Sequence, residues 1–161
     1  MYKMTPLHDA VARRDLARIR ALLEHGANPC EVDDWGYAPM HIIIPEYPED
    51  LDIVDILISF GASVDDQAWT RDAPTPLHIH QRPATFKTAM LQKLLDRGAD
   101  PNFEDANGVT PLMLAIQMGD ATIVDMMAHK LENIDEYLIR SAPDKNTWDV
   151  LVHNHLLSVT N

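Results

Sequence analysis

The sequence predicts an all-α repeat fold, a solenoid of stacked helix-turn-helix units with β-hairpin fingers between them. A helix-start motif occurs four times in 161 residues, with its prolines 33, 37 and 35 residues apart, and a Gly-Ala pair precedes each later copy. Such a period indicates one supersecondary unit that buries its apolar face against the next unit. The four motifs are Thr5-Pro6-Leu7-His8, Ala38-Pro39-Met40-His41, Thr75-Pro76-Leu77-His78 and Thr110-Pro111-Leu112-Met113.

Residues 94–115 contain the whole unit. An apolar helix end stops at Gly98, because the residue after a helix commonly has a positive φ, which glycine adopts without strain. Asn107-Gly108 is a tight-turn dipeptide and predicts the tip of a hairpin. Thr110 can cap the next helix with its hydroxyl, and Pro111 suits the first helical position, where an N–H would be unpaired in any case. The unit is therefore a helix end, a hairpin and a helix start.

This pattern resembles the ankyrin repeat family over residues 4 to about 130, since that family has a period near 33 residues and a helix start that reads T-P-L-H. The resemblance implies that His8, His41 and His78 are structural residues, bonded to the capping threonine and to a neighbouring backbone. It also implies that the chain binds proteins through its hairpin fingers and the concave row of inner helices.

Four repeats are expected within residues 1–130, at about 4–30, 31–64, 65–101 and 102–130. In the second repeat we expect the outer helix over residues 51–60, after a loop that Pro45 and Pro48 keep non-helical. The third repeat has a longer finger, in which Ala73 stands where the neighbouring fingers have Gly36 and Gly108.

Residues 131–161 lack a clean repeat signature and are expected to form a degenerate repeat or a helical C-terminal cap. Ile134, Tyr137 and Leu138 indicate one helix, and Thr147 is expected to cap a second. Covering the end of the stack would keep an apolar face out of water.

The net charge of −12 is unevenly distributed. Residues 31–66 contain ten acidic residues and no lysine or arginine, so the phosphates of a nucleic acid would be repelled. Arginines gather instead in the first repeat, off its apolar stripe. They supply either a polar outer face for the end repeat or an anion site, and they are Arg13, Arg14, Arg18 and Arg20.

The sequence also favours a cytoplasmic location. No apolar run is long enough to span a membrane, and the first repeat begins at once, which leaves no room for a signal peptide. Cys30 is the single cysteine, so an internal disulfide is excluded and a reducing compartment is expected.

Catalytic and metal-binding patterns are missing from the sequence. There is no phosphate loop, no H-E-x-x-H and no G-x-S-x-G. The pairs His78/His80 and His153/His155 are two residues apart, so on a helix their side chains would point to different faces. Cys30 lies in an acidic stretch that disfavours a thiolate. We therefore expect no enzyme activity, no cofactor and no metal site.

Binding residues are expected at the finger tips and along the inner helices. Trp, Tyr and Arg dominate binding hot spots, and large aromatic side chains are unfavourable at a bare surface. Trp35 and Trp69 therefore either anchor a partner or pack against a neighbouring finger. The expected partner-binding residues are Asp33, Asp34, Trp35, Tyr37, Glu46, Trp69, Arg71, Arg82, Asn107, Gln117 and Met118.

The function expected from these features is protein binding. We expect a stand-alone acidic binder or inhibitor of a basic partner protein, of adaptor, effector or toxin-immunity type, which is a monomer when unbound. Acidic fingers would speed the encounter with such a partner. Two alternatives remain: a structural subunit of an obligate assembly, and a small hydrolase.

Overall fold

The computed structural model describes residues 3–79, 87–130 and 143–159 of the chain. These residues form eight α-helices and one short 3-10 helix, which confirms the predicted all-α repeat fold. In chain order the helices are α1 (Pro6–Ala12), α2 (Leu16–Glu24), η1 (Pro39–Ile42), α3 (Pro48–Ser59), α4 (Pro76–Ile79), α5 (Lys87–Asp96), α6 (Pro111–Met118), α7 (Ala121–Ala128) and α9 (Lys145–Val159).

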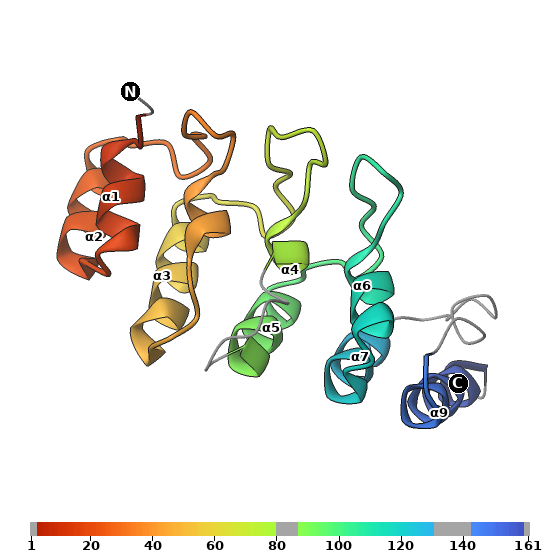
Figure 1. Ribbon diagram of the computed structural model, residues 1–161. Helices are drawn as coiled ribbons and strands as arrows, with labels where there is room; N and C mark the ends of the chain where they lie inside the picture. Colours follow the sequence, from red (N-terminus) through yellow and green to blue (C-terminus); the bar gives the residue numbers. More distant parts are fainter. Residues whose placement is uncertain (1–2, 80–86, 131–142, 160–161) are drawn as a thin grey trace.

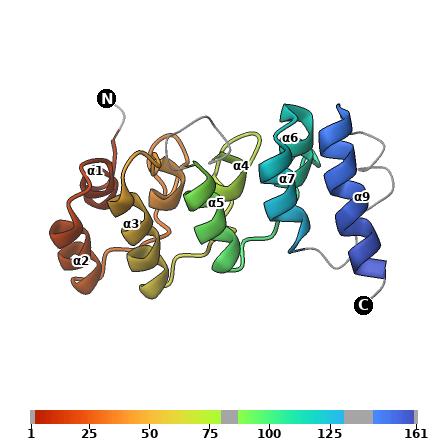
Figure 2. The same cartoon turned by 90° about the horizontal axis from the view of Figure 1, so that it is seen from below.

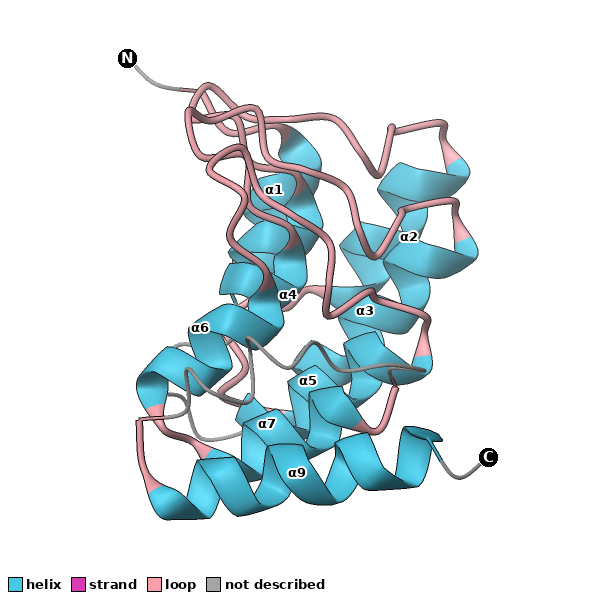
Figure 3. Cartoon of the chain, turned by 90° about the vertical axis from the view of Figure 1, so that its right-hand side faces the viewer, coloured by secondary structure: helices cyan, strands magenta, loops and turns pink. Residues whose placement is uncertain are grey.

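The helices stack in two rows, with loops that project from one edge (Figure 1). The inner row is α1, η1, α4 and α6, and the outer row is α2, α3, α5 and α7. Figure 3, a view along the stack, shows the fingers gathered above the inner row. The pairs follow one another in chain order, and α9 lies beside α6 and α7 at the C-terminal end (Figure 2). The inner helices and the fingers therefore form one continuous side of the molecule.

The helices begin and end as the local chemistry predicts. The Thr110 hydroxyl oxygen accepts the N–H of Met113 at 3.1 Å, and Pro111 occupies the first turn of α6. Gly98, with φ of +92°, follows the end of α5. The Thr110 hydroxyl thus pairs with a backbone group that the start of a helix leaves unpaired, and the positive φ of Gly98 is the conformation that commonly ends a helix.

No residue in the described ranges belongs to a β-strand, so the predicted β-hairpin fingers are hairpin-shaped loops. Each loop closes with too few cross-bonds to make a ladder: Asp33 N–H donates to the Tyr37 carbonyl at 2.9 Å, and Asp105 N–H donates to the Val109 carbonyl at 2.8 Å. Single backbone bonds then join neighbouring fingers. The N–H of Trp69 donates to the Gly36 carbonyl at 2.6 Å, and that of Ala106 donates to the Asp72 carbonyl at 2.9 Å.

The core is a continuous apolar layer between the two helix rows. In the second repeat Ile53, Val54 and Leu57 are fully buried, as the helical spacing predicts. We also expected Ile58 to face inward at this helical spacing, but Ile58 is only half-buried and Ile56 is buried in the core. None of the helices described is both long and apolar enough to cross a membrane.

The outer helix of the second repeat begins earlier than predicted. It starts at Pro48 instead of residue 51, so the prediction that Pro48 keeps the loop non-helical is wrong. A proline at the first helical position costs no hydrogen bond. The carboxylate of Asp50 completes this helix start, because its Oδ2 accepts the N–H groups of Glu46 at 3.0 Å and Tyr47 at 2.8 Å.

Arg14 was expected to supply part of a polar outer face or an anion site, but its side chain binds the next repeat. Its Nε donates to Oδ1 of Asp50 at 2.8 Å, and its guanidinium lies 4.5 Å from the centre of the Tyr47 ring. Asp50 is only 2% exposed. Arg14 therefore ties the turn between α1 and α2 to the start of α3 in the next repeat.

Arg14→Met is expected to lower the free energy of unfolding by roughly 1–2 kcal/mol, because one oxygen of the buried Asp50 carboxylate loses its partner. The other oxygen keeps two backbone donors, which limits the effect. Urea denaturation measures the change. Arg13→Met is the matched control, since Arg13 pairs with Asp9 in an exposed bridge and should have no measurable effect. Equal melts for the two variants would contradict this role for Arg14.

The last helix, α9, packs against α7 through residues that include the buried Leu151. Its cap is Asp144, whose Oδ1 accepts the N–H of Thr147 at 2.8 Å. Thr147 itself is buried within the first turn, so the prediction that it caps the helix is wrong. The helix expected around Ile134, Tyr137 and Leu138 lies outside the described residues, and the division at residue 130 stays a prediction.

Candidate functional site

Histidines of the inner row hold the bases of the fingers in place. Nδ1 of His8 contacts the Thr5 hydroxyl at 2.7 Å, and its Nε2 donates to the carbonyl of Tyr37 at 2.7 Å. His78 repeats this arrangement, with Thr75 at 2.8 Å and the Val109 carbonyl at 3.0 Å. Each histidine thus links its own helix start to the next finger, as the family resemblance implied.

His41 makes the same link although no threonine precedes its proline. Its Nδ1 accepts the backbone N–H of Ala38 at 3.2 Å, and its Nε2 lies 3.0 Å from the Asp66 carbonyl. Burial lowers the pKa of His41, which keeps the ring neutral and able to accept at Nδ1. The three histidines are therefore part of the framework that positions the fingers.

Two of the three tryptophans lie at the tips of the first two fingers. Trp69 is 81% exposed and Trp35 is 48% exposed. The backbone of Trp69 packs closely on the first finger, since a Cβ built on Gly36 would lie 2.5 Å from the Trp69 carbonyl oxygen. The second finger therefore rests on the first through its backbone, while the Trp69 indole remains at the surface.

Asp33 and Asp34 have different roles despite being neighbours. Asp33 is only 7% exposed, and its Oδ1 accepts the N–H groups of Trp35 at 2.9 Å and Tyr37 at 3.0 Å. Asp33, an expected binding residue, is therefore buried and stabilises the turn. Asp34 is exposed, and its Oδ2 accepts the Lys3 N–H at 2.7 Å.

The other expected site residues divide between two regions. Near the tips, Arg71 and Asn107 are exposed, and Tyr37 is half-buried at the finger base. Away from the fingers, Glu46 lies in the loop that joins η1 to α3, with its Oε2 3.6 Å from Nη2 of Arg14. Exposed residues at the end of α6 are Gln117 and Met118. The structure thus does not gather the set into one patch, and Arg82 lies outside the described residues.

Two neighbouring hollows open between the fingers and the inner helices. The larger, of about 280 Å³, is lined on its polar side by Thr70, Asp72 and Asp105. The smaller, of about 200 Å³, is lined by Tyr37, His41, Ile42 and Ile79. Tyr37 and Ile79 line both hollows, so the two form a bipartite depression on the inner side.

Asp72 and Asp105 are not among the site residues expected from the sequence. One signal was present: Asp105 stands three residues before Gly108, as Asp33 stands before Gly36. Its Oδ1 accepts the N–H groups of Asn107 at 2.8 Å and Val109 at 3.0 Å, which matches the turn at Asp33. Asp72 has no such spacing, and only the fold brings it to the same hollow.

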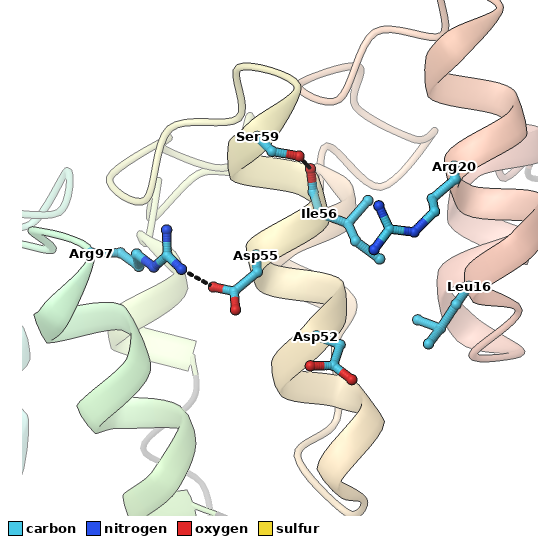
Figure 4. Close-up of a pocket in the computed structure, with 7 residues that line it drawn as sticks. All are labelled: Leu16, Arg20, Asp52, Asp55, Ile56, Ser59 and Arg97. Atoms are coloured by element: carbon cyan, nitrogen blue, oxygen red, sulfur yellow. Dashed lines mark hydrogen bonds and ion pairs between the residues drawn. The ribbon is translucent and has the colours of Figure 1, made fainter.

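A third hollow, of about 550 Å³, lies on the outer side between α2 and α3 (Figure 4). Its walls have mixed charge, with Arg20 on α2 and Asp52 on α3. Asp55 at its edge is already paired, with Arg97 at 2.6 Å and Lys93 at 2.8 Å. The pairing of Asp55 leaves less negative charge on this side than the sequence suggests.

Catalytic chemistry finds little support in the described part of the chain. Within it, no group of three or more His, Cys, Asp or Glu residues could hold a metal ion. Burial raises the pKa of the Cys30 thiol, and its Sγ lies 3.8 Å from the Gly61 carbonyl oxygen. A thiol in this environment is a poor nucleophile.

Comparison with known proteins agrees with this geometry. A family model described as ankyrin repeats in three copies matches residues 46–138, and another described as ankyrin repeats in many copies matches residues 7–42.

Similar proteins come from several animals. The ANK repeat-containing protein nipk-1 of Caenorhabditis elegans is 26% identical, over 93% of this chain and 26% of its own length. The B-cell lymphoma 3 protein homolog of Mus musculus is 28% identical, over 85% and 31%. The Ankyrin repeat and SOCS box protein 6 of Homo sapiens is 32% identical, over 78% and 28%. The chain thus spans about a quarter to a third of these relatives.

Proposed function

Because the chain belongs to the ankyrin repeat family, we propose that it binds another protein along its fingers and inner helices, and that this partner presents a basic surface. Ankyrin repeat proteins are protein-protein interaction modules, and such relatives are generally not enzymes. The proposal therefore assigns this chain a binding role without chemistry of its own.

The negative charge of the fingers is the main observation that supports a basic partner. Residues 31–38, 65–74 and 102–110, which make the three fingers, contain eight acidic residues and one base, Arg71. The acids are Glu31, Asp33, Asp34, Asp65, Asp66, Asp72, Glu104 and Asp105. Elsewhere in the described chain, acids such as Asp50 and Asp55 are neutralised by arginine or lysine. A partner approaching the fingers meets a negative field, which steers basic surfaces and rejects acidic ones.

The exposed indole of Trp69 also favours the fingers as the binding face. An aromatic side chain exposed to this degree on a finger held by backbone bonds is a preformed anchor, and tryptophan is enriched in binding hot spots. We propose that the chain acts as an acidic binder of inhibitor or adaptor type in a reducing, cytoplasmic compartment, and that it is monomeric until it binds. The alternative, a subunit of an obligate assembly, would place the same face against a permanent partner.

Affinity capture from the native cell, followed by surface plasmon resonance at two ionic strengths, tests the proposal. Trp69→Ala should raise the dissociation rate and weaken the free energy of binding by about 2 kcal/mol, because an aromatic side chain that the partner buries mainly governs dissociation. Trp148→Ala, at a half-exposed tryptophan on α9, is the control and should leave binding unchanged.

The contribution of the acidic finger residues to association is tested separately. Glu31→Gln with Asp34→Asn should slow association and flatten its dependence on salt, since rim charges mainly affect the encounter. Glu49→Gln with Asp52→Asn makes the same charge change on α3 and should have a smaller effect. Unchanged kinetics in both the Trp69 variant and the finger variant would show that the partner docks on another face.

A further inference from the structure

The bipartite depression between the fingers and the inner helices has a definite chemistry on each side. The carboxylates of Asp72 and Asp105 come from neighbouring fingers and line the larger hollow together. Oδ1 of Asp72 lies 3.3 Å from the Asn107 amide nitrogen, and Oδ1 of Asp105 accepts two backbone N–H groups. Within the described part of the chain, the Oδ2 atom of each accepts no hydrogen bond and pairs with no cation. The hollow therefore has acceptor capacity that its own walls leave unused.

The remaining walls neither compete for these carboxylates nor repel a cation. Both nitrogens of His78 are engaged, with Thr75 and with the Val109 carbonyl, so the ring presents no charge-bearing donor to the hollow. Tyr37 lines both hollows, and the face of an aromatic ring attracts a cation placed over it. Ile42 and Ile79 contribute apolar side chains to the smaller hollow, which Tyr37 and His41 also line.

We propose that the larger hollow receives a lysine or arginine side chain of the protein partner, and that an aliphatic residue beside it in the partner's sequence enters the smaller hollow. The inference rests on the proposed function and deepens it, because it names the residue type that the inner side recognises. Asp72 and Asp105 supply the charge, Tyr37 supplies the aromatic wall, and Ile42 and Ile79 supply the apolar contact. The exposed Trp69 indole belongs to the same second finger and adds contact outside the hollow.

The test uses the whole protein and a blocked peptide, acetyl-Gly-Arg-Leu-Gly-amide, followed by amide chemical shifts in NMR. The peptide should shift the amides of Thr70, Asp72, Ile79 and Asp105. A second peptide with citrulline in place of arginine has the same shape without the charge, and it should bind about fivefold more weakly or worse. Binding of the arginine peptide should also weaken as salt rises.

Two matched double variants test whether Asp72 and Asp105 bind the arginine. Asp72→Asn with Asp105→Asn should weaken binding of the arginine peptide by about fivefold or more, and asparagine retains the Oδ1 acceptor that the turn at Asp105 uses. Glu49→Gln with Asp52→Asn changes the net charge equally on α3 and should leave binding unchanged. Circular dichroism checks that each variant folds, and Asp72→Asn alone serves if the double variant does not.

The outcomes separate this inference from the proposed function. Equal binding of the citrulline and arginine peptides, or equal loss in the two double variants, overturns the inference. If Trp69→Ala weakens binding of a captured partner while the arginine peptide fails to shift the hollow, the proposed function stands and this inference falls. If the peptide binds in the hollow but neither tested finger variant alters partner binding, the hollow has the inferred chemistry and the proposed binding face is wrong.

Discussion

Leu94→Ala is expected to lower the free energy of unfolding by roughly 2–5 kcal/mol. Leu94 is 0% exposed in α5, which packs between α3 and α7 in the outer row. Truncation removes the apolar contacts and leaves a cavity that a stack fixed on both sides cannot fill by collapse. Leu57 in α3 is equally buried, so Leu57→Ala should behave in the same way. Urea denaturation measures both.

Thr88→Ala, at an exposed position of α5, is the control and should alter stability little. Because each repeat contacts only its neighbours, loss at Leu94 should weaken the interfaces with both adjacent repeats. A change below about 0.5 kcal/mol in Leu94→Ala would contradict the burial of this residue and the register of the third repeat.

The repeat architecture was predictable because each of its signals is local. The cap at Thr110 and the glycine at position 98 lie within a few residues of the helix end that they serve. The histidines were predictable through the family resemblance, although their second bond reaches far along the chain. His8 and Tyr37 are 29 residues apart, and the repeat period carries that separation.

Contacts that do not follow the period were missed. Arg14 meets Asp50 across 36 residues, through an irregular loop whose path the sequence does not set. Asp33 was expected to bind a partner, but its carboxylate closes a local turn by accepting two backbone N–H groups. The hollow at Asp72 and Asp105 requires three repeats to be stacked before it exists, so no single segment could reveal it.

Gly36→Ala should have the second large effect on stability, lowering the free energy of unfolding by roughly 2–4 kcal/mol. Two costs combine at this position. Gly36 has φ of +85°, which strains a residue with a side chain, and an added Cβ would lie 2.5 Å from the carbonyl oxygen of Trp69. That oxygen belongs to the residue whose N–H donates to Gly36, so the clash opens the contact between the first two fingers. Because the backbone of Trp69 must move, the variant should also weaken partner binding.

Two equivalent positions in the other fingers separate the costs. Gly108 has φ of +74° with no heavy atom within 4 Å of an added Cβ, so Gly108→Ala reports the backbone cost alone, about 1 kcal/mol. Ala73 already carries a Cβ at φ of +45°, so Ala73→Gly should raise stability by up to about 1 kcal/mol. Thermal and urea denaturation should therefore show that Ala73→Gly is more stable than the natural chain. Gly108→Ala should be less stable than the natural chain, and Gly36→Ala the least stable of the three variants. Equal losses for Gly36→Ala and Gly108→Ala would show that the first two fingers do not depend on their close backbone contact.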